Sequence, residues 1–328
     1  MTIPVAQRAF FAVIGVAALF VAYLGIVTPA AMDASFTWAQ LPPLHAGFVG
    51  MLYLFGGVFM VGCLFARRRS QVAAALPAIA LFTSLLLLAT VLNSEAFDFG
   101  LAPVWVWTLS YTIYPAIALG LLAWSARRPA ADPANAIDAA DAAGATDAAD
   151  AAGTTGAATL PRWARTFLRA QGIAFALVGA LLLVAPSSMV DAWPWPISAG
   201  LAQFYGGPFL AYAACSWHYA GRAAWSDLAA IVPAMLAFNA GTLVVSLLHR
   251  DLFSSSDPAA WAWFAGFGVA AAVLLAITGR VLHELLLDDP DGPRRGAKEV
   301  QRADPLHGRE EARLEQRVDD HDQSRALA

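Results

Sequence analysis

Two stretches of the chain, WPWPISAGLAQFYGG at residues 193–207 and FTWAQLPPLHAGFVG at residues 36–50, each place tryptophan and proline just before a long apolar segment. A shift of 157 residues carries Trp38 onto Trp195. Farther along, after the loss of one residue, a shift of 156 carries Trp107 onto Trp263. Matches in rare residue types that keep their register over such a distance favour a duplicated unit over chance.

The composition indicates a membrane protein. Of the 328 residues, 59% are hydrophobic and 13% charged, whereas soluble domains carry about 25% charged residues. The charges are also segregated, because half of the 24 acidic residues and eight of the 20 basic residues follow Val281. Elsewhere apolar runs recur at about twenty residues, the length that crosses roughly 30 Å of hydrocarbon as a helix. The net charge of −4 therefore gives no indication of nucleic-acid binding.

The apolar runs are continuous, which predicts helices rather than barrel strands, whose residues alternate in polarity. Eight spans are predicted, at residues 9–28, 45–65, 73–92, 103–124, 166–185, 201–219, 228–248 and 260–280. The predicted fold class is an all-α membrane protein, with eight transmembrane helices arranged as two parallel four-helix repeats. Cys63 and Cys215 fall inside spans and outside any CxxC motif, which favours small packing residues over a disulfide or metal pair.

The duplication also predicts the domain boundaries. We expect the first four-helix membrane repeat at residues 1–128 and the second at residues 162–284. The Ala- and Asp-rich residues 129–161 offer little apolar bulk to bury, which predicts a disordered cytoplasmic linker. Residues 285–328 are expected to form a charged cytoplasmic tail.

The arginines predict the orientation of the spans. Most of them flank what would be one side of the membrane, namely Arg8, Arg67, Arg68, Arg69, Arg127, Arg128, Arg162, Arg165, Arg222 and Arg280. The loops of the opposite side hold only Arg250. Because cytoplasmic loops carry the excess of basic residues, both termini are expected in the cytoplasm. The predicted location is the bacterial cytoplasmic (inner) membrane, crossed several times.

The motif WPWPI at residues 193–197, the downstream AQFYGG at residues 202–207 and the four compact spans resemble small bacterial integral membrane proteins of unknown function. Those proteins are built from a four-helix unit, here duplicated in tandem. The first copy departs from the pattern, because FTWAQLPPL replaces the double Trp-Pro. The resemblance implies a membrane fold and no catalytic residue.

Polar residues near the ends of spans are the first candidates for a ligand site, since each is costly in a bilayer unless it finds a partner. The repeat makes Glu95 equivalent to Asp251, and Asn93 equivalent to His249. Together they are candidate ligands for a cation or a solute in an outer vestibule. The alternative is a set of water-exposed helix ends, with Arg250 neutralising the neighbouring carboxylate.

A second candidate pair, His45 and Gln203, lies within one residue of equivalence behind the tryptophan-containing loops. A lone histidine at this depth is more often an interfacial hydrogen-bonder than a metal ligand. A metal site would need further histidine or cysteine ligands nearby, and His249 is the only second histidine of suitable depth on the same side. The sequence therefore predicts no metal and no cofactor.

The third candidate set is a helical face in the fourth predicted span. Thr108, Tyr111, Thr112 and Pro115 recur at the spacing of one face. Proline frees a backbone carbonyl that neighbouring hydroxyls or water can satisfy, so this face is a candidate cavity lining. A polar seam between two helices explains the same pattern.

Three classes of function fit these features. The favoured class handles a small solute or lipid, as a transporter or a binding module, in a cavity between two pseudo-symmetric halves. The alternative is a structural or assembly subunit with no ligand of its own. An intramembrane enzyme acting on an isoprenoid-like substrate is least favoured, and the chain has no GxxxxGK[ST], HExxH or GxSxG motif. Expected partners are membrane lipid and a small solute or cation, with a second copy or a membrane-complex subunit left open.

The predicted orientation can be tested with single cysteines. We expect cysteines at Ser94 and Ser198 to react with a membrane-impermeant thiol reagent in cells with a permeable outer membrane, because both positions are predicted to face outward. A cysteine at Ala145 should stay unlabelled until the inner membrane is opened. The mass shift of the protein reports the labelling, and a reaction at Ala145 alone would reverse the topology.

Overall fold

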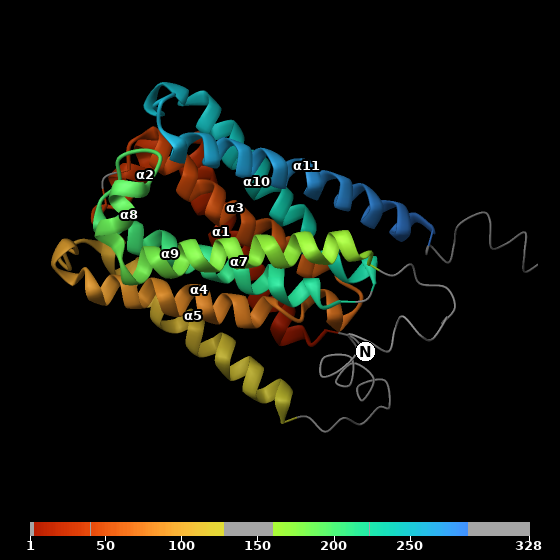
Figure 1. Ribbon diagram of the computed structural model, residues 1–328. Helices are drawn as coiled ribbons and strands as arrows, with labels where there is room; N and C mark the ends of the chain where they lie inside the picture. Colours follow the sequence, from red (N-terminus) through yellow and green to blue (C-terminus); the bar gives the residue numbers. More distant parts are fainter. Residues whose placement is uncertain (1–2, 40, 128–159, 223, 288–328) are drawn as a thin grey trace, which may run out of the picture. The chain divides into compact units, whose positions relative to one another are not determined.

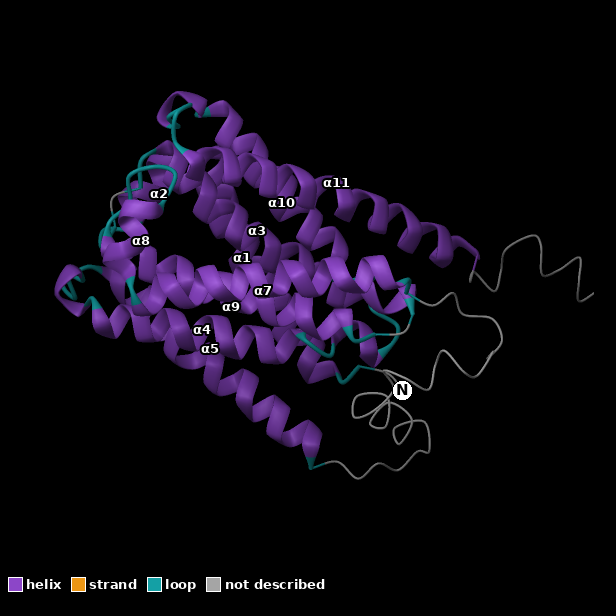
Figure 2. Cartoon of the chain, in the orientation of Figure 1, coloured by secondary structure: helices purple, strands orange, loops and turns teal. Residues whose placement is uncertain are grey.

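A computed structural model describes residues 3–39, 41–127, 160–222 and 224–287. Within these ranges every regular element is helical and no strand occurs (Figures 1 and 2). The predicted linker lies outside the described residues except for residues 160–161, and the predicted tail lies outside them except for residues 285–287. The described residues up to Val281 belong to one compact unit.

The described part of the chain contains eight long helices, each overlapping one predicted span. They are α1 (Val5–Val27), α3 (Pro43–Phe65), α4 (Ala75–Leu92), α5 (Ala102–Ala126), α7 (Arg162–Val184), α9 (Ala199–Ala220), α10 (Val232–Leu248) and α11 (Pro258–Leu287). Shorter elements connect them, namely α2 (Pro29–Ser35), α8 (Pro186–Ala192) and the 3₁₀ turns η1 (Arg69–Val72), η2 (Ser94–Ala96), η3 (Trp225–Leu228) and η4 (Arg250–Leu252). The same order of elements thus occurs twice.

Six of these helices, α1, α3, α4, α5, α7 and α11, are long and apolar enough to cross a membrane. Six of the eight predicted spans are therefore long and apolar enough to be candidate membrane spans. Helix α10 is apolar but only 17 residues long. Helix α9 is long enough but includes Gln203, Ser216 and His218. Both pack against helices of the other half of the chain, which reduces the surface that must be apolar.

The two halves of the chain exchange neighbours. Helix α1 packs on α3 and α7 packs on α9, but α10 packs on α3 and α4 packs on α9 (Figure 1). The third long helix of each half therefore lies against the second long helix of the other half. Small residues permit this approach, because a Cβ on Gly62 would lie 2.7 Å from the Ala230 carbonyl oxygen. These contacts therefore join helices from the two predicted repeats.

The opening motif belongs to a packed aromatic cluster, and each half of the chain has one. The first tryptophan cluster consists of Phe36, Trp38, Phe97, Trp107 and Tyr111, and the second of Trp193, Trp195, Phe253, Trp263 and Phe267. Trp38 and Trp107 have ring centroids 4.7 Å apart, and their counterparts Trp195 and Trp263 are 4.8 Å apart. The WPWPI motif thus packs a loop onto helix ends.

Hydrogen bonds repeat between the two tryptophan clusters as well. The Trp107 indole donates to the Thr90 hydroxyl at 2.9 Å, and the Trp263 indole donates to the Ser246 hydroxyl at 2.9 Å. Each bond fixes the last long helix of a half, α5 or α11, to the preceding long helix. Buried indole donors usually find such a partner, whereas those of Trp193 and Trp195 in the second cluster have none among the described residues.

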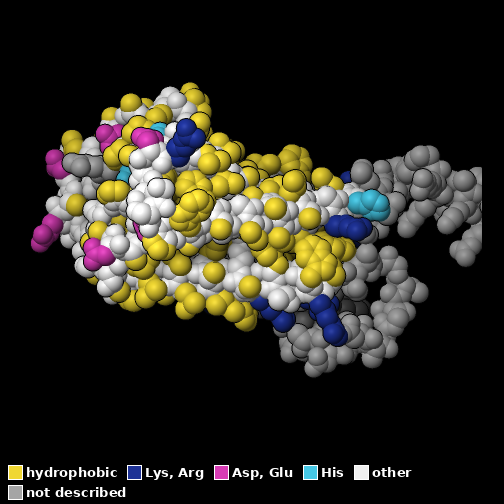
Figure 3. All heavy atoms as spheres, turned by 45° about the horizontal axis from the view of Figure 1, so that its top comes forward, with side chains coloured by type: hydrophobic (Ala, Val, Ile, Leu, Met, Phe, Trp, Pro, Cys, Tyr) yellow, Lys and Arg dark blue, Asp and Glu magenta, His cyan; other side chains and the backbone are white. Residues whose placement is uncertain are grey.

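At the opposite end of the bundle, η1 and η3 join the halves. The Gln71 side-chain amide donates to the Ser226 carbonyl oxygen at 2.9 Å, and the Tyr219 hydroxyl donates to the Gln71 carbonyl oxygen at 2.7 Å. Ser70 donates to the Asp227 carboxylate at 2.5 Å. Figure 3 shows acidic side chains gathered at the tryptophan-cluster end and most basic side chains toward the η1 and η3 end.

The close packing of α1 on α3 predicts the effect of one added methyl group. A Cβ on Gly25 would lie 2.3 Å from the Ala46 carbonyl oxygen and 2.8 Å from the Gly50 Cα. Since both contacts are with backbone, Gly25→Ala should separate the helices and destabilise the protein by about 1–3 kcal/mol. We expect a lower unfolding midpoint in detergent.

The matched control is Gly120→Ala in α5, where an added Cβ meets nothing within 4 Å. Alanine is the better helix former by about 1 kcal/mol, so the midpoint of this variant should be unchanged or higher. Equal midpoints for the two variants would contradict the described contact between α1 and α3.

Candidate functional site

The two predicted carboxylate ligands are exposed and separate. Glu95 lies in η2 and Asp251 in η4, and neither makes a hydrogen bond or ion pair with a described residue. The connections that contain η2 and η4 stand at opposite edges of the same end of the bundle (Figure 1). The exposed Arg250 makes no ion pair with Asp251. The geometry therefore gives no support to a shared vestibule, and their role as ligands stays a prediction.

Two candidates from different predicted sets, Asn93 and Gln203, contact each other. The Asn93 side-chain amide donates to the Gln203 side-chain oxygen at 2.7 Å and to the Ala89 carbonyl oxygen at 2.8 Å. The Gln203 amide donates to the Leu183 carbonyl oxygen at 3.3 Å. The pair ties the end of α4 to α9. His249, the counterpart of Asn93, is half-buried at the end of α10.

His45 packs beside the second tryptophan cluster. It is buried, its Nδ1 lies 3.4 Å from the Tyr205 hydroxyl, and its ring meets Trp195 edge-on with centroids 6.3 Å apart. This environment suits an interfacial hydrogen-bonder. Among the described residues, no group of three His, Cys, Asp or Glu side chains could hold a metal ion. Cys63 and Cys215 are free, buried thiols, as the sequence predicted.

The predicted polar face of α5 is divided in the structure. Tyr111 is buried and faces a cavity, whereas Thr112 is exposed and donates to the Thr108 carbonyl oxygen at 2.8 Å. The Thr108 hydroxyl is buried without a partner and does not line the cavity. The cavity side of α5 instead carries Trp107, Ser110, Tyr111 and Tyr114. Of the four predicted residues only Tyr111 therefore lines this cavity, and a ligand-binding role of Thr108 and Thr112 stays a prediction.

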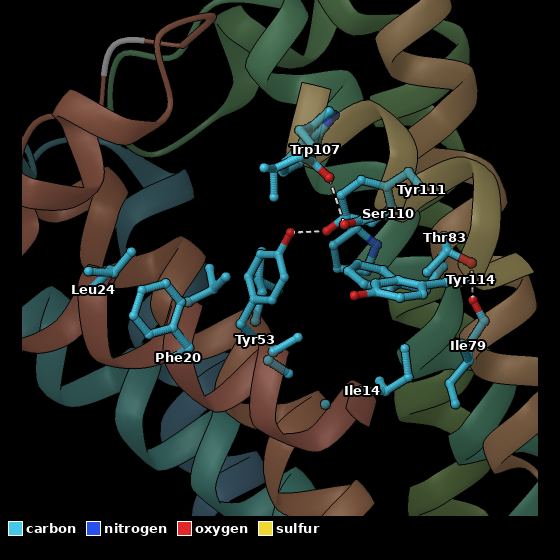
Figure 4. A pocket seen from close by; sticks show the side chains of 18 of the residues that line it. Ile14, Phe20, Leu24, Tyr53, Ile79, Thr83, Trp107, Ser110, Tyr111 and Tyr114 are labelled. Atoms are coloured by element: carbon cyan, nitrogen blue, oxygen red, sulfur yellow. Dashed lines mark hydrogen bonds between the residues drawn. The ribbon is translucent and has the colours of Figure 1, made fainter. Parts of the chain in front are cut away.

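A cavity of about 600 Å³ lies between α1 and α5. Its walls come mainly from α1, α3, α4 and α5 (Figure 4). Ser35 of α2, Phe36 and Trp38 of the loop after it, and Pro208 and Ala211 of α9 complete the lining. The lining residues include no Asp, Glu, Lys, Arg or His. Phe20 on α1 and Val106 on α5 both line it and are 61% and 67% exposed. The cavity therefore opens at the surface between these two helices.

The cavity is elongated along the helices. On α1 its lining runs from Ile14 to Leu24, and ten residues of helix rise about 15 Å. This length is about half of the hydrocarbon thickness of a bilayer. The volume falls within the roughly 300–1,000 Å³ of small-molecule sites.

Two tyrosines supply a hydrogen-bonding group in this apolar space. The hydroxyls of Tyr53 and Tyr111 point toward each other and form a hydrogen bond (Figure 4). One proton is used in that bond, and the second O–H has no acceptor among the described residues. Ser110 and Thr83, by contrast, donate to carbonyl oxygens of their own helices at 2.6 Å. The tyrosine pair can therefore donate to an oxygen of a molecule in the cavity.

Sequence reasoning identified Tyr111 but missed Tyr53. The available signal was a tyrosine in the interior of an apolar span, away from the aromatic belts expected at membrane surfaces. Its partner could not be identified, since the pairing depends on how α3 and α5 are turned toward each other. Comparison with family models, curated proteins and solved structures gives no match. The resemblance to proteins built from a four-helix unit accordingly stays a prediction.

The contacts at the ends of α4 and α10 predict opposite results in two double-mutant cycles. We expect Asn93→Leu and Gln203→Leu to couple by about 0.5–1.5 kcal/mol in the free energy of unfolding, because they share a hydrogen bond. Glu95→Gln and Asp251→Asn should each stay within about 0.5 kcal/mol of the wild type and show no coupling. Unfolding in mixed micelles measures both cycles. Coupling between the two carboxylates would instead favour the shared vestibule.

Proposed function

We propose that this chain binds a lipid-like molecule, largely apolar and carrying one oxygen-containing group, in the cavity between α1 and α5. The cavity itself carries this proposal, since it combines a volume of about 600 Å³, an apolar lining and tyrosine hydroxyls available as donors. Several long apolar helices make the chain an integral membrane protein. The cavity thus opens toward the space where such molecules are dissolved.

The lining favours a lipid over a cation or a water-soluble solute. A cation entering this space would lose its hydration shell and find no charged or strongly coordinating group in return. The residues at the opening, Phe20 and Val106, are apolar and exposed, so the entry route is lateral, from the hydrocarbon between the helices. An apolar chain keeps an apolar environment along this whole path.

We further propose that the chain is a parallel duplication with eight spans. The repeated order of elements, the matching tryptophan clusters and the exchanged helix contacts support the duplication. Helices α9 and α10 would then be the two additional spans, and 17 residues of α10 rise about 25 Å. The location of most arginines near the η1 and η3 end supports a cytoplasmic position for that end and for both termini, in a bacterial inner membrane.

The alternative function is that of a structural or assembly subunit. Helix α5 packs on α4 and exposes large apolar residues, including Leu109 and Ile113. A helix from a second copy or from another subunit could then cover the opening between α1 and α5. The two functions differ in what occupies the cavity after purification.

Filling the cavity distinguishes the two functions. Ala18 lines the cavity from α1, and Ala18→Phe should fill the space with a phenyl ring. We expect wild-type protein to carry about one lipid-like molecule per chain, detected by mass spectrometry after mild extraction. The variant should retain less than a tenth of that amount.

The control for this experiment is Ala174→Phe, the same substitution on the exposed side of α7, which should keep the molecule. Wild-type protein that carries no molecule, and that forms a dimer which Ala18→Phe dissociates, would favour the structural subunit.

A further inference from the structure

The second half of the chain fills the corresponding space with one of its own side chains. Phe175 on α7 stacks on Tyr212, with ring centroids 4.3 Å apart and an interplanar angle of 27°. Three more rings surround it, since its centroid lies 5.0 Å from Phe209, 6.0 Å from Phe238 and 6.2 Å from Phe267. Four aromatic side chains therefore form a partly open enclosure around the planar ring of Phe175, which is half-buried.

The residues at the corresponding positions of the first half line the cavity. Under the shifts of 157 and 156 residues, Phe175 corresponds to Ala18. The four surrounding rings correspond, in the order Phe209, Tyr212, Phe238 and Phe267, to Leu52, Phe55, Phe82 and Tyr111. Ala18 and these four residues all line the cavity. The first half therefore retains the walls of the enclosure and lacks the ring inside it.

One pair of wall residues keeps its spacing, since Phe82 and Tyr111 have ring centroids 6.1 Å apart and their counterparts Phe238 and Phe267 are 5.7 Å apart. Trp107 and Tyr111 have ring centroids 4.3 Å apart, and their counterparts Trp263 and Phe267 are 4.4 Å apart. The corresponding helices are held by matching indole hydrogen bonds. The space vacated at Ala18 is thus shaped by the same framework that encloses the Phe175 ring.

We infer that the molecule bound between α1 and α5 carries a planar six-membered ring, seated at Ala18 as the Phe175 ring is seated in the second half. This inference rests on the proposed function and specifies the chemical class of its ligand. The ring bears an oxygen substituent that accepts a hydrogen bond from the Tyr53–Tyr111 pair. An apolar chain on the ring follows α1 and leaves toward the bilayer past Phe20.

The polar residues beside the two enclosures also differ between the halves. In the second half the Tyr212 hydroxyl accepts from the side-chain amides of Gln171 and Asn239 at 2.6 and 2.7 Å. No such amides stand in the first half, where the corresponding residues are Ile14 and Thr83. The tyrosine hydroxyls at positions 53 and 111 have the apolar counterparts Leu210 and Phe267. The hydroxyls of the first half are therefore held only by each other, whereas the Tyr212 hydroxyl of the second half is held by two amides.

Three ketones test the planar ring in the wild-type protein. The first is 4-decylacetophenone, the second is the analogue with a saturated cyclohexane ring, and the third is the unringed 2-hexadecanone. All three carry one carbonyl acceptor and a long chain. Binding to full-length protein in nanodiscs, freed of co-purified molecules, is measured by quantitative native mass spectrometry. We expect the aromatic ketone to bind at least about tenfold more tightly than either analogue, because only a flat ring can stack on Phe55.

The possible outcomes test the planar ring and the lipid-binding function separately. Equal binding of all three ketones at one site would overturn the planar ring and leave the lipid-binding function standing. Binding of none of them, together with the absence of a co-purified molecule, would overturn both.

Creating a second binding site in the other half tests whether the two enclosures are equivalent. Phe175→Ala should create a second enclosure and raise the stoichiometry of 4-decylacetophenone from one to two per chain. Combining it with Ala18→Phe should return the stoichiometry to one. The control, Phe65→Ala, removes a ring that is 80% exposed and should leave the stoichiometry at one.

A folded Phe175→Ala variant that still binds one molecule would overturn the equivalence of the two enclosures. Circular dichroism and the unfolding midpoint establish whether the variant is folded. If it does not fold, the selectivity among the three ketones in the wild-type protein still decides the inference.

Discussion

The contacts of α3 with α10 and of α4 with α9 are the interactions on which the described bundle depends. In a bilayer no hydrophobic force draws one apolar helix to another, so association depends on close packing and on buried polar contacts. Glycines supply the close packing here, as where a Cβ on Gly47 would meet the Val245 side chain at 2.8 Å. The Asn93–Gln203 hydrogen bond supplies a polar contact between α4 and α9. Because each contact joins the two halves, neither half completes its packing alone.

This exchange leaves α1 and α5 on either side of an opening, and the cavity follows from that arrangement. In the second half the equivalent region is closed by the Phe175 ring, whereas Ala18 leaves it open in the first. The difference between a packed core and a binding cavity thus depends largely on one side chain. A duplicated architecture permits such a division, since one half can supply packing while the other keeps a space of the same shape.

The sequence predicted where the helices lie but not which side of a helix faces its neighbours. Continuous apolar runs of span length located every long helix that the structure describes, because length alone constrains a membrane helix. The facing of α5 could not be read in this way, since apolar residues surround it and leave no polar side to orient it. Ser110 and Thr112 are chemically alike and two positions apart, yet one lines the cavity and the other faces outward. Ser110 lies one helical turn after Trp107, on the side of α5 that the Trp107–Thr90 hydrogen bond joins to α4.

Polar groups inside the bundle differ in whether they have a hydrogen-bond partner within the protein. Asn93, Gln203 and His45 were candidates because a polar group inside a membrane is costly, and the structure gives each of them protein neighbours. Their hydrogen bonds therefore contribute to packing. The Tyr53–Tyr111 pair differs, because its second O–H finds no acceptor among the described residues and faces an apolar cavity. Leaving a donor unsatisfied beside an apolar space costs free energy that a hydrogen bond to a ligand oxygen would recover, and this gain supports the proposed ligand at the tyrosine pair.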